Sequence, residues 1–243
     1  MNHRPGLFIA LAVLAAACEG TETGNPFVGE IRVHAHSSAP AMVIVGDDGS
    51  TTRVTGLWLA SADLALLGDD CAAAVATVAR PTDVDVATTI GENQVELDGA
   101  TLCGAHLVLD PAAAPASAPV GFAGHTVWVE GTRADGTPFV VRSDLAGDLA
   151  LPAVDARFVI EADAPAVFLG FDVAVWLGDV DLAGAVPDGD GVIVIDATTD
   201  PTRAAAFDDD VGRGIQLYRD VDRDGTVSSP DDVLLAQGQV VTP

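Results

Sequence analysis

The sequence predicts a mainly β fold, an antiparallel β-sandwich followed by a small, partly helical C-terminal region. Short runs rich in Val, Ile, Thr and aromatic residues recur along most of the chain, with turn residues between them. Asp48-Gly49 and Asp135-Gly136 each stand between two such runs, as in tight β-hairpins. The composition then changes, because 14 of the 29 aspartates fall in the last 66 residues. Eight or more short strands joined by short turns are typical of a sandwich.

The chain begins with a hydrophobic leader. His3 and Arg4 give it a weakly basic start, and residues 7–17 form an apolar run of eleven. That run is too short to span a bilayer, which needs roughly 20 apolar residues. Small alanine side chains directly precede Cys18. We therefore predict that residues 1–17 are a cleaved secretory signal peptide.

The segment that ends at Cys18 resembles the lipobox of bacterial lipoproteins, in which this Cys becomes the acylated first residue of the mature protein. Ala15 departs from the Leu usual at its place in that family, so cleavage by an ordinary signal peptidase near Cys18 is the alternative. We expect residues 18–29 to form a tether, and its Thr-Glu-Thr-Gly-Asn string resembles the start of many uncharacterised bacterial lipoproteins. The resemblance implies a lipid anchor in the cell envelope, at the outer membrane or cell surface.

The β-sandwich is expected over residues 30–177. Its predicted strands are residues 31–36, 41–46, 51–59, 94–97, 102–109, 126–130, 138–142, 157–161 and 167–176. The proline-rich residues 111–119 cannot pair in a sheet, because proline lacks the amide hydrogen, and should form a loop over its edge. Trp58, Trp128 and Trp176 lie in apolar runs, which favours core packing over a sugar-stacking platform.

Three cysteines suit an exported protein, since the anchor takes Cys18 and leaves two to pair. Neither a C-x-x-C motif nor a Cys/His ligand spacing competes for Cys71 and Cys103. We predict a disulfide between them, which would stabilise the fold by roughly 3.5 to 4 kcal/mol in the chain-entropy model. A free catalytic thiol is the remote alternative.

The charge is strongly negative, with 36 acidic residues against 11 basic residues and a formal net charge of −25. All eleven basic residues are Arg, and Lys is absent. Such a field repels phosphate backbones and anionic lipid headgroups, so it disfavours nucleic-acid binding and favours divalent cations. Genome bias or a salty habitat would also produce an Asp-rich surface, so the spacing of the aspartates has to decide.

The acidic C-terminal region, residues 178–243, carries helix signals. Asp200-Pro201 predicts an N-cap and first turn, and the apolar face of that helix would comprise Phe207, Val211, Ile215 and Tyr218. A strand over residues 214–219 is the alternative, because Gly212 and Gly214 each weaken a helix by about 1 kcal/mol. A second helix is predicted from Ser229 to Gly238.

A twelve-residue segment, residues 220–231, has the pattern of a calcium loop. Calcium takes six to eight oxygen ligands, and such a loop supplies them from alternate positions. Gly225 stands at the position of the sharp turn, and Val227 supplies an apolar residue for the core. The predicted ligands, at positions 1, 3, 5, 7, 9 and 12, are Asp220, Asp222, Asp224, the Thr226 carbonyl, Ser228 and Asp231.

This segment resembles the EF-hand loop, and its Asp at position 12 is closer to the dockerin version. The resemblance implies one calcium site, which in a lone extracellular loop has a dissociation constant of about 0.1 to 1 mM. A solvated acidic turn is the alternative. Residues 184–196 lose the alternation of acids after Asp190, so we interpret them as a hairpin entry rather than a second cation site.

Other candidate sites are weaker. His34 and His36 share one face of a strand and could bind zinc with His106 or His125, but Arg32 on the same face favours an ordinary polar surface. The acid pairs Asp83 with Asp85 and Asp179 with Asp181 could serve a glycosidase, although 29 aspartates produce such pairs by composition. The sequence has no Gly-x-Ser-x-Gly, Gly-Lys phosphate loop or His-Glu-x-x-His motif.

Together these features predict an exported, lipid-anchored protein that is a calcium-stabilised binding or structural component of the cell surface. Its ligand would be a protein or a polysaccharide, and we do not expect it to bind nucleic acid. The alternatives are a carboxylate-dependent hydrolase on the sandwich and a dockerin-like docking module. We expect a binding or structural role rather than an enzymatic one, because no nucleophile or paired-acid motif stands out.

Overall fold

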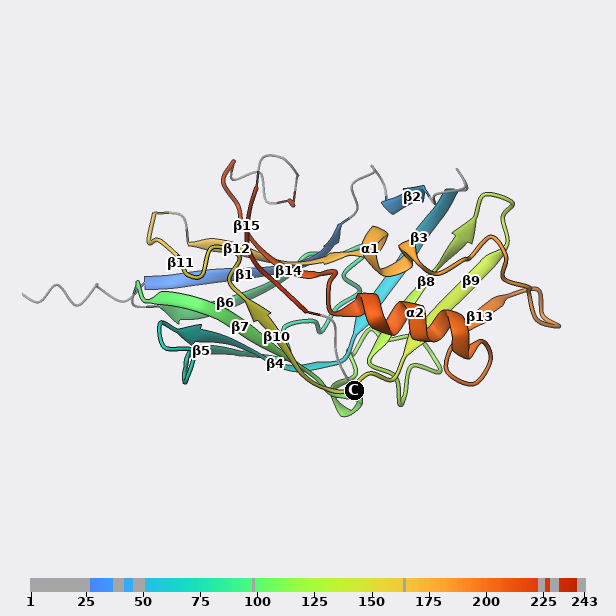
Figure 1. The fold of residues 1–243 in the computed structure, drawn as a ribbon, viewed down its shortest axis with the longest axis horizontal. Coiled ribbons are helices and arrows are strands. Elements are labelled where there is room, and N and C mark those ends of the chain that lie inside the picture. Colours follow the sequence, from blue (N-terminus) through green and yellow to red (C-terminus); the bar gives the residue numbers. More distant parts are fainter. Residues whose placement is uncertain are drawn as a thin grey trace, which may run out of the picture.

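The fold of the described residues is mainly β, as the sequence predicts, and consists of three five-stranded sheets with two short α-helices (Figure 1). The computed structural model describes residues 27–36, 42–45, 51–97, 99–163, 165–222, 226–227 and 232–239. Neither of the described α-helices is long and apolar enough to cross a membrane.

The first sheet, here called the β1 sheet, has the strand order β15-β14-β12-β1-β6. β1 runs parallel to β12 and antiparallel to β6, with seven paired residues on each side. The last strands of the chain therefore complete the sheet that holds the first. The strands are β1 (Phe27–His36), β6 (Gly91–Leu97), β12 (Ala166–Asp172), β14 (Ile215–Arg219) and β15 (Val233–Gln237).

The second sheet, the β7 sheet, has the order β10-β7-β4-β5, with β11 also paired to β7. Every described pairing in it is antiparallel. β10 contacts β14 and β15, so this sheet lies against the β1 sheet (Figure 1). Its strands are β4 (Ser61–Gly68), β5 (Ala74–Ala79), β7 (Thr101–Leu109), β10 (Gly147–Pro152) and β11 (Phe158–Val159).

The third sheet, the β8 sheet, has the order β13-β9-β8-β3-β2. The predicted hairpin at Asp135-Gly136 is confirmed, since β8 and β9 pair antiparallel around it and Gly136 has a φ of 82°. β13 joins β9 in parallel. Its strands are β2 (Val43–Val45), β3 (Thr51–Leu59), β8 (Val127–Arg133), β9 (Pro138–Ser143) and β13 (Ile193–Ile195).

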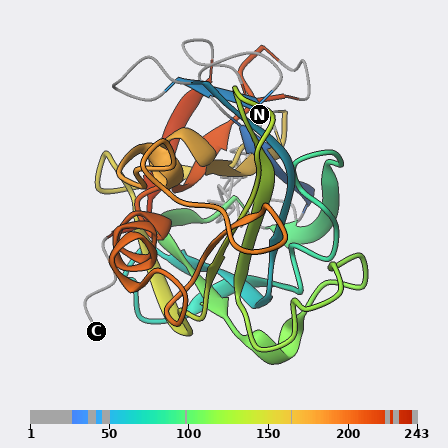
Figure 2. The same cartoon turned by 90° about the vertical axis from the view of Figure 1, so that its right-hand side faces the viewer.

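Both helices begin at aspartate caps. The Asp172 carboxylate accepts hydrogen bonds from the first turn of α1 (Val173–Gly178), and the Asp200 carboxylate caps α2 (Pro201–Val211). Trp176 of α1 is fully buried, and its Nε1 donates to the Val211 carbonyl at 2.9 Å. The two helices contact each other, and α2 contacts β9 and β13 (Figure 2).

Alternating burial produces one large core and one small one. Ile31, Val33 and Ala35 of β1 point into the large core, which includes residues of all three sheets and both helices. The small cluster lies on the opposite face of the β8 sheet and contains Trp58 and Trp128. All three tryptophans are buried, so the predicted core packing is confirmed.

The predicted second helix is wrong where the structure describes it. Val233–Gln237 form strand β15, which pairs antiparallel with β14 and buries Leu235 and Ala236. Pairing with a distant strand overrides a local helix signal, because helix propensity is a weak preference. The expected cap at Ser229 lies outside the described residues.

Two further boundaries differ from the prediction. α2 ends at Val211, and Ile215 and Tyr218 belong to β14, so the alternative of a strand over residues 214–219 is confirmed. The strand expected over residues 167–176 ends at Asp172, because the Asp172 side chain caps α1. The sequence prediction also missed β4, β5, β10 and β13.

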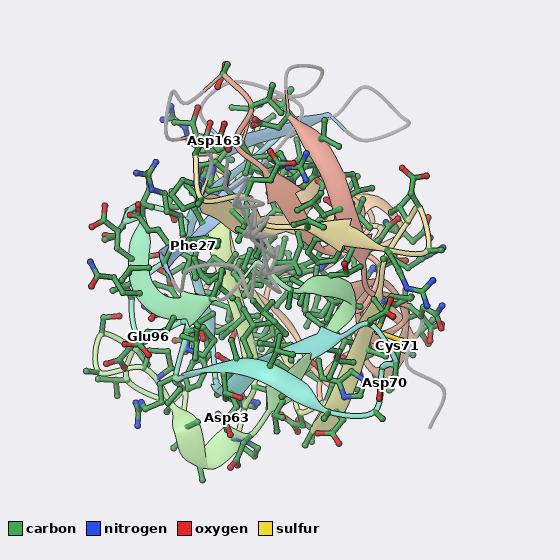
Figure 3. The ribbon with its side chains drawn as sticks, turned by 90° about the vertical axis from the view of Figure 1, so that its left-hand side faces the viewer. Phe27, Asp63, Asp70, Cys71, Glu96 and Asp163 are labelled. Atoms are coloured by element: carbon green, nitrogen blue, oxygen red, sulfur yellow. A yellow bond between two sulfur atoms is a disulfide. The ribbon has the colours of Figure 1, made fainter. Side chains whose placement is uncertain are left out.

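The disulfide between Cys71 and Cys103 is confirmed, with 5.7 Å between the two Cα atoms. It connects the turn between β4 and β5 to β7 and closes a loop across the β7 sheet. Figure 3 shows Cys71 beside Asp70 near the edge of the molecule. Cys18 and the tether up to residue 26 lie outside the described residues.

Candidate cation site between β14 and β15

The predicted calcium segment connects two antiparallel strands rather than two helices. It begins at Asp220, directly after β14, and β15 begins at Val233. Because β14 and β15 are neighbours in the β1 sheet, the pairing returns the end of the segment to its beginning (Figure 1). Acids near the two strand ends can therefore share one site.

Three aspartates meet at this place. One ligand oxygen of each of Asp220, Asp222 and Asp232 lies within 4.8 Å of the other two. Asp220 is 4% exposed, Asp232 is partly buried and Asp222 is exposed, so the group opens from the protein to solvent. Among the described residues, this is the only group of three or more His, Cys, Asp or Glu side chains this close together.

The segment is attached to the outer face of β1 at two points. Asp220 Oδ2 lies 3.6 Å from Arg32 Nη1, and the Val227 amide donates to His34 Nε2 at 3.3 Å. Burial, assisted by neighbouring His36, lowers the pKa of His34 to about 4. The imidazole is thus neutral at pH 7, the state in which its Nε2 accepts this bond.

Within the loop, Asp232 also closes the hairpin. Its Oδ1 accepts the Val221 amide at 3.0 Å, which fixes the carboxylate beside the first residues of the segment. Three carboxylates bring three negative charges to one place, with one guanidinium beside the buried member. Oxygen-only, anionic donors suit a hard divalent cation such as Ca²⁺ or Mg²⁺, so the group could hold a metal ion.

Of the six predicted ligands, the structure describes Asp220, Asp222 and Thr226. It brings the first two together, and Thr226 lies next to the amide that contacts His34. Asp224, Ser228 and Asp231 lie outside the described residues. Sequence reasoning missed Asp232, whose signal was its place directly before a strand that pairs back to β14.

The histidines do not form the zinc site that was considered. The His34 and His36 rings lie 6.4 Å apart between centroids, and His36 packs edge-on against Tyr218. His106 is on β7 of another sheet, and His125 contacts Asp144 near β8. No third His, Cys, Asp or Glu joins the pair within the described part of the chain.

The considered acid pairs have structural partners. Asp83 accepts hydrogen bonds from Arg80 and the Ala116 amide, and Asp85 accepts the Leu57 amide at 3.0 Å. Carboxylates engaged in this way stabilise turns and offer little for acid–base chemistry.

The second pair is engaged in the same way. Asp181 accepts from Arg203 and the Gly184 amide, and Asp179 lies 3.8 Å from Arg213. In the other acidic segment, the Asp188 carboxylate accepts the amides of Asp190 and Val192, and forms the turn before β13. These acids therefore hold loops in place near α2.

No protein-family model, curated protein or solved structure matches this chain. The function therefore has to be inferred from the geometry and chemistry of the molecule.

Proposed function

We propose that this protein is an exported, lipid-anchored component of the bacterial cell envelope with a binding or structural role, and that its C-terminal loop binds one calcium ion. The observation that carries the proposal is the group of Asp220, Asp222 and Asp232 within a segment of alternating acids. Export is the companion proposal, because calcium is abundant outside the cell and because Cys18 follows a leader of the signal-peptide type.

The proposed ion has a structural role. It would neutralise carboxylates at the loop end of the β14–β15 hairpin, where Asp220 is attached to β1 through Arg32. At about 1 mM free calcium and a dissociation constant of about 0.1 mM, binding would stabilise the folded state by about 1.4 kcal/mol. That is support for one end of the β1 sheet rather than a signalling switch.

The anchor and the charge define the partners that we propose. Acylation of Cys18 would hold the chain at a membrane, and the net charge of −25 disfavours nucleic acids and anionic lipid surfaces. A protein or a polysaccharide is the proposed ligand. A carboxylate hydrolase and a dockerin-like module have less support, because the candidate acid pairs accept structural hydrogen bonds and the loop joins two strands.

Calorimetry of the folded protein tests the cation proposal. We expect 1 mM calcium to raise the melting temperature above that in EDTA by about 3 to 6 °C, as about 1.4 kcal/mol implies for a chain of this size. The double variant Asp222→Asn, Asp232→Asn keeps the side-chain shapes but removes two charges, and should melt alike in calcium and EDTA.

The matched control is Asp148→Asn with Asp209→Asn, which removes two exposed charges away from the loop. The control should keep the full calcium response. Equal melting of the unmodified protein in calcium and EDTA would overturn the cation proposal. A magnesium titration shows whether the site prefers the larger ion.

The anchor has its own test. Cells that express the full chain and are fed radiolabelled fatty acid should incorporate label into the protein, and Cys18→Ser should abolish this incorporation. The matched control Cys71→Ser with Cys103→Ser leaves Cys18 in place and should retain the label. Unlabelled parent protein, or label that persists in Cys18→Ser, would contradict lipidation at this residue.

A further inference from the structure

A second feature, on the outer face of the β8 sheet, is an aromatic surface under a cover. The cover, here called the strap, is residues 110–125, which connect β7 to β8. Beneath it lie Trp58 and Trp128, which are 8% and 7% exposed. They form a small apolar cluster separate from the main core, together with Ala60, Phe122 and the flanking Ala114, Ala118 and Val140.

The planar groups of this face form a row across three strands. Trp58 of β3 lies directly opposite Trp128 of β8, and Trp128 lies directly opposite Arg142 of β9. The Arg142 guanidinium stands over the Trp128 ring, 5.2 Å from its centroid. Neighbouring strands are about 4.8 Å apart, so the row repeats at a spacing comparable to the length of one sugar ring.

Trp58 reaches over Gly56 of its own strand. A Cβ atom at Gly56 would overlap ring atoms Cζ3 and Cη2 of Trp58, so the absence of a side chain there makes room for the indole. The indole is therefore held against this face of the sheet, beneath the strap. It offers a stacking surface when its cover is removed.

The indole nitrogens of Trp58 and Trp128 differ in their hydrogen bonding. Trp128 Nε1 donates to Glu130 Oε2 at 3.3 Å. Trp58 Nε1 is buried and has no hydrogen-bond partner among the described residues. A buried donor without a partner is destabilising, and the closed strap imposes this cost on Trp58. A ligand hydroxyl or a water molecule would relieve it once the strap opens.

The strap is attached to the rest of the protein mainly at its ends. There the Asp110 amide donates to the Ala60 carbonyl at 3.0 Å, and His125 Nδ1 contacts Asp144 Oδ1. Residues 111–124, all of them described, make backbone-to-backbone hydrogen bonds only within the strap. Two further bonds link this middle part to the rest of the protein, from Arg80 Nη2 to the Ala114 carbonyl at 2.8 Å and from the Ala116 amide to Asp83 Oδ1 at 3.0 Å. We call Arg80 and Asp83 the latch; both side chains are 49% exposed, and they pair at 3.1 Å.

Segments with few bonds to the body open locally at a small free-energy cost. Opening breaks the two hydrogen bonds between the strap and the latch and leaves the Arg80–Asp83 pair intact. Because both latch side chains are half-exposed, water can replace the broken bonds, and their net contribution is modest. Phe122 is the one large apolar anchor of the strap in the cluster, and the other strap residues there are alanines.

We propose that the strap opens and that Trp58, Trp128, Arg142 and Glu130 then bind the sugar rings of a neutral polysaccharide. The apolar C–H faces of the sugar would stack on the indoles, while sugar hydroxyls accept from Trp58 Nε1 and donate to Glu130. The net charge of −25 excludes anionic chains. This inference rests on the proposed binding role of the chain, but it needs neither the calcium ion nor the lipid anchor.

A latched surface binds with an affinity reduced by the fraction of molecules that are open. Weakening the latch should therefore tighten binding. The latch variant is Arg80→Ala with Asp83→Ala, which removes both hydrogen bonds to the strap. A net loss of about 1 kcal/mol predicts about a fivefold gain in the open population and in affinity.

The matched control is Arg157→Ala with Asp69→Ala, which removes another exposed Arg–Asp pair far from the strap. Acrylamide quenching of tryptophan fluorescence reports opening, because Trp176 stays fully buried and any gain comes from the strap cluster. The latch variant should be quenched more strongly than both the parent and the control.

Affinity electrophoresis reports binding. The probes are hydroxyethylcellulose, galactomannan and soluble starch, with carboxymethylcellulose as the anionic counterpart of the first. We expect at least one neutral probe to retard the latch variant more than the parent, and the anionic probe to retard neither. Adding Trp58→Phe to the latch variant keeps an aromatic residue but removes the donor and part of the ring, and should reduce the retardation.

Two kinds of result would contradict this proposal. Unchanged quenching in the latch variant would overturn the opening of the strap. Increased quenching without retardation by any neutral probe, or equal retardation by the anionic probe, would overturn the ligand class. Neither result affects the calorimetric test of the cation loop, so failure of the ligand inference and failure of the cation proposal are distinguishable.

Discussion

Irregular segments contact the outer faces of the β1 sheet and the β8 sheet, and these two segments, here called covers, differ in chemistry. The cation loop contacts β1 through charged and polar groups, Arg32 with Asp220 and His34 with Val227. The strap covers the β8 sheet through apolar contacts with Trp58 and Trp128. The first cover depends on charge, protons and ions, whereas the second depends on hydrophobic contact and shape.

Because of this difference, the two covers are sensitive to different substitutions. Charges that are taken from water need their partners, so removing one partner of a buried carboxylate weakens its compensation. An apolar cover made mainly of alanines buries little area per residue, so it can separate from the sheet without disturbing the main core. Substitutions at the cation loop should therefore alter stability and its dependence on calcium and pH. Substitutions at the strap should alter mainly local opening.

The largest expected effect is on the charged cover. Arg32→Met removes the guanidinium beside buried Asp220 and should destabilise the fold in EDTA by about 3 kcal/mol. Calcium should reduce this loss, because the ion supplies the missing positive charge. Urea unfolding with and without calcium measures both values. The control Arg157→Met, in an exposed pair with Asp69, should change stability by less than about 0.5 kcal/mol. Equal losses in the two variants would contradict the comparison.

The next effect is pH dependence confined to the charged cover. Burial lowers the pKa of His34 from 6.5 to about 4, so below pH 6.5 the unfolded chain takes up a proton here before the folded protein does. The contribution of neutral His34 to the free energy of unfolding is fully present above pH 6.5 and is lost as the pH falls toward 4. The free energy of unfolding should fall by about 2 kcal/mol between pH 7 and pH 5.

His34→Gln keeps an acceptor for the Val227 amide but does not titrate, so its stability should vary less over this range. His106→Gln on β7 is the matched control and should retain the parent profile. Urea unfolding at pH 7, 6 and 5 measures the three curves. Coincident slopes for the parent and His34→Gln would show that the charged cover is not the pH-sensitive region.

The smallest expected effect is at the apolar cover. Arg80→Ala removes only a half-exposed latch contact and should lower global stability by less than about 1 kcal/mol. Hydrogen exchange of the strap amides should nevertheless rise by up to about fivefold, while exchange in β7 and β8 stays unchanged. A uniform rise across the β8 sheet would mean that the strap belongs to the main cooperative unit.

The sequence predicted what depends on local pattern. Apolar and polar residues alternate along β1, which places Ile31, Val33 and Ala35 on one face. With Cys18 assigned to the anchor, Cys71 and Cys103 had only each other as partners. Asp220 and Asp222 stood at the first alternate positions of the loop. Period, turn chemistry and cysteine count are all short-range signals.

The predictions that were wrong or missing depend on pairing between strands and on contacts between segments. Asp232 joins the candidate site because β15 returns beside β14, and the local sequence there favoured a helix. β5 is rich in alanine, a weak strand former, and is held in place by its pairing with β4. The latch joins residues more than thirty positions apart, from Arg80 to the strap, and no spacing rule connects them.

The position of β1 between two strands has a mechanical consequence. It is the first described strand, and it is hydrogen-bonded along both sides over seven residue pairs, to β12 and to β6. A force applied to the chain ahead of Phe27 and directed along the strand would have to shear both ladders at once, since neither can be unzipped one bond at a time. Strand β1 should therefore resist a pull on the chain ahead of it more strongly than a strand paired on one side only, and the cation loop contacts its outer face.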